Sequence, residues 1–178
     1  MAHRLARISI LVSAGLVLYI FESYIPRPLP WIKPGLANIA SLLALALYGF
    51  RTGLSVTLLR VLIASFIMGS FLNPAFILAA GAGIAATCTM GAIFALLPEK
   101  FSIIGISIAG AFAHNVAQIC LASIFLFGNS QIFYLLPVLT LSSLLTGFLV
   151  GIVAHFSLQR MSGVGDSFAA SRNHETNP

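Results

Sequence analysis

Charged residues are scarce in this chain: only 7% of its 178 residues are Asp, Glu, Lys or Arg, and 59% are hydrophobic. Soluble domains carry about 25% charged residues, so the composition excludes a soluble globule and indicates an integral membrane protein. The sequence pI is near 9.8. It does not indicate nucleic-acid binding, because the nine basic residues are scattered over loops and ends and form no patch.

Motifs of catalysis and energy coupling are also missing. The sequence has no G-x-x-x-x-G-K-[ST] phosphate-binding loop, which excludes ATP hydrolysis by that route. It has no Asp-rich pair that could hold magnesium on a diphosphate. The two cysteines, Cys88 and Cys120, lie in apolar runs and predict neither a disulfide framework nor a metal site. We therefore expect no enzymatic activity, no cofactor and no metal.

What the sequence does contain is a series of apolar segments, and a membrane-spanning helix needs about 20 such residues. Charges, prolines and glycines separate six of them, of which the second is rather short. The first follows a basic N-terminus, as a signal peptide would. We interpret it as a retained span because no A-x-A-like cleavage site follows it. The predicted spans are residues 8–25, 35–50, 52–69, 75–97, 103–127 and 132–156.

These segments predict an all-α, polytopic membrane protein with six transmembrane helices in residues 1–160. Residues 161–178 form a polar, Gly/Ser-rich tail that we expect to be disordered. Small residues spaced four apart, such as Gly147 and Gly151, favour close packing of helices within the chain. Pro137 predicts a kink in the sixth span.

The basic residues predict the orientation. Six spans place both termini on one side of the membrane, and that side collects most of the Lys and Arg residues, leaving only Arg27 and Lys33 on the other. The positive-inside rule therefore predicts an inner-membrane protein with both termini in the cytoplasm. The basic residues on the predicted cytoplasmic side are Arg4, Arg7, Arg51, Lys100, Arg160 and Arg172.

Arg60 is the main candidate for a functional residue, because it lies near the middle of the third span. A guanidinium at that depth costs roughly 2.5–3.5 kcal/mol on insertion scales, so it indicates a functional site by default. The fifth span carries His114, Asn115 and Gln118, which share one helix face. Two interpretations of these three residues stay open: they line a substrate site with Arg60, or they bond neighbouring helices.

Four further polar residues fall on the predicted outer half of the membrane: Glu22, Lys33, Asn38 and Asn73. With Arg60 they predict a site that opens outward and is closed by the Pro-rich residues 26–34. Glu22 has a second interpretation, as an interfacial charge or as the partner of Arg60. Because no acidic residue lies at mid-membrane, we expect an anionic or strongly polar ligand beside Arg60 and no ion-coupled mechanism.

Several segments, taken together, resemble the Gx transporter family, whose members are also labelled heptaprenyl diphosphate synthase component I. They cover most of residues 8–156. The segments are F-E-S-Y-I-P (21–26), K-P-G-L-A-N (33–38), L-L-R-V-L (58–62), G-S-F-L-N-P-A-F (69–76), F-S-I-I-G-I-S-I-A-G-A (101–111) and A-H-N-V-A-Q (113–118).

The resemblance implies a fold similar to the substrate-binding S components of energy-coupling-factor (ECF) transporters. It implies a subunit that captures a cofactor-precursor-type molecule and works with a transmembrane coupling subunit and ATPases. It also carries the eight polar residues named above onto the family's pattern. Two other functions stay open: a non-catalytic membrane component of polyprenyl diphosphate synthesis, and an assembly scaffold.

Overall fold

The structure is a computed structural model that describes residues 2–24, 35–97, 100–128 and 130–175. Every regular element in this part of the chain is helical, which confirms the all-α prediction with six α-helices. The elements are α1 (Ala2–Tyr24), α2 (Asn38–Tyr48), α3 (Phe50–Ile67), α4 (Pro74–Leu96), α5 (Ile103–Ala122), the π-helical turn η1 (Ser123–Phe127), the 3₁₀ segment η2 (Ser130–Leu135) and α6 (Leu136–Glu175).

Five of the described helices are long and apolar enough to cross a membrane: α1, α3, α4, α5 with η1, and α6 with η2. Helix α2 has only 11 residues. At a rise of 1.5 Å per residue it is about 16 Å long, roughly half of a bilayer's hydrocarbon core. The second predicted span is therefore helical, but it does not cross a membrane by its own length.

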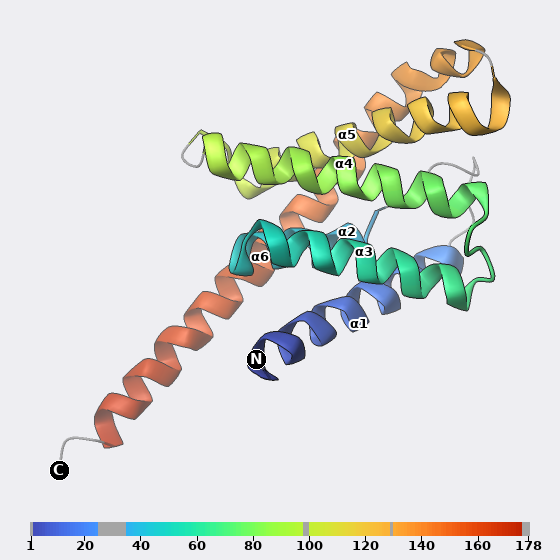
Figure 1. The fold of residues 1–178 in the computed structure, drawn as a ribbon. Helices are drawn as coiled ribbons and strands as arrows, with labels where there is room; N and C mark the ends of the chain where they lie inside the picture. Colours follow the sequence, from blue (N-terminus) through green and yellow to red (C-terminus); the bar gives the residue numbers. More distant parts are fainter. Residues whose placement is uncertain (1, 25–34, 98–99, 129, 176–178) are drawn as a thin grey trace.

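The helices pack in a sequence that follows the chain. Helix α5 makes its most extensive contacts with α4 and α6, and α3 packs against α2, α4 and α1. Figure 1 shows the start of α1, the α2–α3 turn, the end of α4 and the far end of α6 directed toward one end of the molecule. One end of the bundle therefore holds the α2–α3 turn, and the opposite end holds the connection from α3 to α4. Arg60 lies nearer the end with the α3–α4 connection.

Helix α2 lies at the centre of the bundle and is shared by two apolar clusters. On one side Ala40 and Ala44 pack with Val12 of α1 and Val56 of α3. On other sides α2 packs against α4, α5 and α6 in a second cluster. That cluster consists of Ile39, Leu42, Leu45, Met90, Ile106, Val150 and Ala154. Burial on several sides explains why so short a helix is mostly apolar.

Glycines bring α5 and α6 close together. A Cβ at Gly147 would lie 2.6 Å from Ile108 Cα, and one at Gly151 would lie 2.7 Å from Ile104 Cα. A side chain at either position would push the two backbones apart, because real Cβ atoms do not approach that closely. The predicted packing of these small residues within the chain is confirmed.

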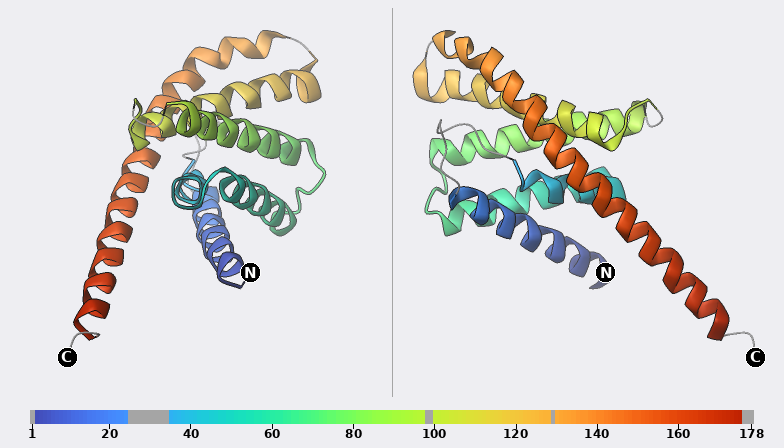
Figure 2. Two further views of the ribbon diagram at one scale, coloured as in Figure 1. Left: turned by 60° about the vertical axis from the view of Figure 1, so that its left-hand side comes forward. Right: turned by 180° about the vertical axis from the view of Figure 1, so that it is seen from behind.

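Helix α6 differs from the prediction at both of its ends. Pro137 is its second residue and does not kink it from within. A proline in the first helical turn removes no intrahelical hydrogen bond. At the other end the helix passes through Met161 and continues to Glu175, although that part was expected to be disordered. Figure 2 shows this end projecting away from the other helices.

Candidate functional site

Arg60 is buried between helices, with 5% of its surface exposed. Its Nη2 donates a hydrogen bond to Asn38 Oδ1 at 3.1 Å, which joins α3 to the first turn of α2. Gly15 of α1 makes room for the arginine stem, because a Cβ there would lie 2.9 Å from Arg60 Cδ. Arg60 Nε is buried and has no hydrogen-bond partner among the described residues.

A hydroxyl cluster fixes α3 one turn before Arg60. Thr57 Oγ1 lies 2.9 Å from Ser41 Oγ on α2 and 2.9 Å from Thr87 Oγ1 on α4. All three side chains are buried. Since buried hydrogen-bonded groups resist displacement, this cluster holds the part of α3 that presents Arg60.

A small cavity lies beside Arg60 at the end of the bundle where α3 passes into α4. Its volume is about 50 Å³, which is enough for a few water molecules. Polar groups reach it from α1, α3 and the α3–α4 connection. The other lining residues are Tyr19, Val61, Ala64, Ser65, Ser70, Ala75, Phe76 and Ala79.

Glu22 is buried near the end of α1, with 3% of its surface exposed. Its carboxylate accepts a hydrogen bond from the Gly35 N–H, which connects the end of α1 to the residues before α2. The same carboxylate attracts the Arg60 guanidinium electrostatically. Glu22 is thus enclosed by protein at the end of α1, and its role as the partner of Arg60 stays a prediction.

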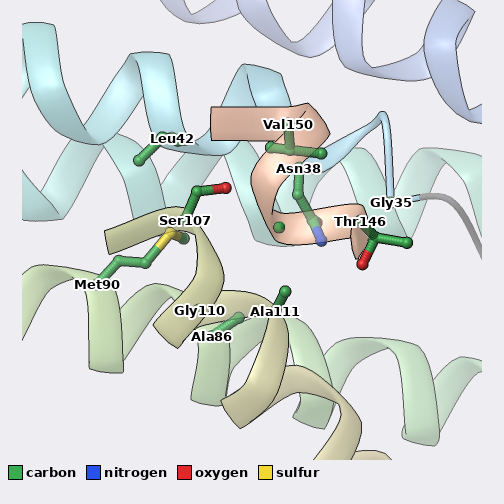
Figure 3. A pocket seen from close by; sticks show the side chains of 11 residues that line it. Gly35, Asn38, Leu42, Ala86, Met90, Ser107, Gly110, Ala111, Thr146 and Val150 are labelled. Atoms are coloured by element: carbon green, nitrogen blue, oxygen red, sulfur yellow. The ribbon is translucent and has the colours of Figure 1, made fainter. Parts of the chain in front are cut away.

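Asn38 separates two cavities. Its oxygen faces Arg60, and its side chain also borders a central cavity between α2, α4, α5 and α6 of about 20 Å³, room for one water. Figure 3 shows the Asn38 side chain directed into this cavity, toward Thr146 of α6 and Ala111 of α5. Asn38 therefore links the arginine to the second half of the bundle.

The polar face of α5 lies elsewhere. Asn115 Nδ2 donates a 2.8 Å hydrogen bond to the carbonyl oxygen of Leu139 on α6. Gln118 borders an apolar cavity of about 110 Å³ formed with α4, η1, η2 and α6. His114 is half-buried on the same helix. The lining of the Arg60 cavity includes no described residue of α5, so the structure does not bring this stripe and the arginine together.

Asn73 does not line the Arg60 cavity. Asn73 is exposed before α4, where its carbonyl oxygen accepts hydrogen bonds from Phe76 N and Ile77 N. Lys33 and the predicted closing segment 26–34 lie outside the described residues.

Comparison with known proteins places the chain in a family. The family model described as heptaprenyl diphosphate synthase component I matches residues 11–157, which include all the Arg60 contacts described above. The chain belongs to the heptaprenyl diphosphate synthase component I family. No curated protein matches the sequence.

The fold of this chain matches a solved structure described as the S component of a bacterial ECF transporter. The TM-score is 0.69, with 18% sequence identity, over 92% of this chain and 97% of that one. The match extends over almost the whole of both chains and confirms the S-component-like fold, and with the apolar helices it supports a multi-pass membrane protein.

The part of the chain that the structure describes holds no cluster of three or more His, Cys, Asp or Glu side chains.

Sequence reasoning missed Tyr19, Ser65 and Ser70 as neighbours of Arg60. Tyr19 precedes Glu22 by three residues, so the two share a face of α1, and that spacing could have identified it. Ser70 follows α3, and its position beside the arginine depends on the path of the chain between α3 and α4, which the sequence does not show.

Proposed function

We propose that this protein is the substrate-capture subunit of a membrane transporter that imports a small polar or anionic molecule. The observation that carries the proposal is Arg60, buried beside a cavity with one guanidinium nitrogen that no described residue bonds. Such a nitrogen can donate to a carboxylate or phosphate oxygen of a ligand. The S-component-like fold supports the same reading.

In this proposal each residue around Arg60 has a separate role in ligand binding. Arg60 supplies the positive charge, Asn38 fixes the guanidinium plane, and Glu22 balances the charge while the site is empty. Tyr19, Ser65 and Ser70 offer hydroxyl groups to the polar part of the ligand. Asn115 is assigned a packing role, since its amide already bonds α6. Substrate-binding roles for His114, Gln118, Lys33 and Asn73 stay predictions.

The site must open to admit a ligand. Ligand pockets measure about 300–1,000 Å³, whereas the cavity at Arg60 measures about 50 Å³. Helix α1 forms one wall through Tyr19, and among the described helices it packs mainly against α3 and α2. We infer that α1 moves away from α3 on binding, with the Glu22–Gly35 hydrogen bond breaking or moving with it.

The described helices do not themselves show what drives ligand release or how the protein is oriented in the membrane. We propose that a transmembrane coupling subunit and ATPases drive release, since the chain has no phosphate-binding loop of its own. We also propose that the protein lies in the inner membrane with both termini in the cytoplasm, which the distribution of Lys and Arg supports. The Arg60 cavity then opens toward the outer side.

The test is ligand-induced stabilisation of the purified full-length protein. Flavin mononucleotide, thiamin monophosphate and a naphthoate carboxylic acid serve as anionic probes, each beside its uncharged analogue. At least one anion should raise the melting temperature of the wild type and not of Arg60→Met. Asn115→Leu is the matched control, because it removes a membrane-embedded polar group outside the Arg60 cavity. Equal stabilisation of the wild type and Arg60→Met would exclude the arginine from the site.

A second candidate function is a non-catalytic membrane role in polyprenyl diphosphate synthesis. The family description favours it, as does the apolar cavity in which Gln118 is the one polar lining residue. Deletion of the gene should then shorten or abolish prenyl chains. Unchanged prenyl synthesis after deletion would exclude this role.

A further inference from the structure

A basic cavity lies at the opposite end of the bundle from the Arg60 site. The α2–α3 turn forms one wall, and the first turns of α1 form the other. Gly49 makes the turn possible with a left-handed φ of +83°. The cavity is open and has a volume of about 620 Å³. Its lining residues are Arg7, Tyr48, Gly49, Phe50, Arg51 and Thr52.

Two arginines from different helices border this cavity. The guanidinium carbon of Arg7 lies 5.2 Å from the centre of the Tyr48 ring, a cation–π distance that restrains the side chain. Arg51 is exposed in the first turn of α3. No lining residue is acidic, and Glu22 is the only acid among the side chains that the structure describes. The cavity thus holds two positive charges with no built-in counter-charge from described side chains.

The cavity lies at a membrane boundary. The apolar windows of α1 and α3 are Leu5–Glu22 and Phe50–Ile67, so both arginines fall within the first turn of a candidate span. Tyr48 and Phe50 are exposed aromatic residues, the type that gathers at the membrane–water interface. Beyond them, exposed apolar side chains such as Ile10 continue along the helices toward the membrane centre.

We propose that this cavity binds the phosphate headgroup of an anionic membrane lipid. Arginine pairs with phosphate through two parallel N–H donors, and basic pockets between helices at the headgroup level favour such lipids. A lipid fits better than free phosphate because the charged cavity continues into an apolar surface that acyl chains can cover. The site is separate from the Arg60 cavity and does not depend on the transport proposal.

Native mass spectrometry of the purified full-length protein tests this site. The protein is mixed with phosphatidylglycerol, or with phosphatidylcholine of the same acyl chains. The wild type should retain one phosphatidylglycerol in preference to phosphatidylcholine. Affinity should fall roughly fivefold for each arginine replaced, and roughly thirtyfold for Arg7→Ala/Arg51→Ala. Lys100→Ala is the matched control, an exposed basic residue near a helix end outside the cavity.

Three outcomes would overturn the proposal. One is equal retention of phosphatidylglycerol by the wild type and the double variant, and another is equal retention of the two lipids by the wild type. The third is displacement of the lipid by inorganic phosphate at equal concentration, which would identify a free anion as the ligand. Should the double alanine variant fail to fold, Arg7→Gln/Arg51→Gln removes both charges with side chains of greater length and gives the same test.

Discussion

The electrostatic partnership of Glu22 and Arg60 gives a quantitative prediction. Both side chains are at least 95% buried, at 3% and 5% exposed, so both charges are desolvated. Glu22→Gln keeps an oxygen that can accept the Gly35 N–H but removes the negative charge that balances the guanidinium. Charges in a protein interact through an effective dielectric constant of about 20, so an attraction of this kind is worth on the order of 2 kcal/mol. We expect a loss of roughly 2 kcal/mol in the free energy of unfolding.

A double-mutant cycle separates this effect from packing. Arg60→Met removes the charge and keeps much of the side-chain volume, so Glu22→Gln/Arg60→Met leaves no uncompensated charge. The double variant should be more stable than the sum of the single losses predicts, by about 1–3 kcal/mol. Unfolding by SDS titration in mixed micelles measures the four free energies, with the exposed Arg51→Met as control. If the loss in the double variant equals the sum of the two single losses within about 0.5 kcal/mol, Glu22 and Arg60 do not interact.

Three further predictions concern packing and the shape of the site. Gly147→Val should lower the melting temperature strongly, because its Cβ would lie 2.6 Å from the α5 backbone, whereas Gly105→Ala meets only ordinary contacts at 3.4 Å and should be tolerated. Asn115→Leu should cost about 1 kcal/mol of unfolding free energy in the same titration, by loss of one interhelical hydrogen bond. Gly15→Ala should displace the Arg60 stem. In the thermal-shift assay it should remove most of the increase in melting temperature caused by the anion, while the melting temperature without the anion falls only slightly.

The sequence predicted the spans well because apolar runs and their breaks are local signals. In the structure Gly49 separates α2 from α3, and α4 begins at Pro74, directly after Asn73. The central position of α2 was not predicted, since length and composition do not reveal that a short apolar helix is enclosed by its neighbours. The sixth helix extends beyond residue 156, where the predicted span ends.

The candidate site was predicted in part. Periodicity predicted three polar residues on one face of α5, but it could not show which helices that face meets. Asn115 turns to Leu139 on α6, and the Arg60 neighbourhood comes from α1, α2, α3 and α4 instead. Contacts between residues far apart in the sequence determine which helices are neighbours. A single sequence carries little information about such contacts.

The most direct test of the account identifies what the protein retains when it is purified. The wild type and Arg60→Met are expressed in the native host and isolated in mild detergent, and bound small molecules are identified by mass spectrometry. We expect a carboxylated or phosphorylated small molecule on the wild type that is absent from Arg60→Met. The same molecule at equal occupancy on both proteins, or a prenyl lipid in its place, would contradict it.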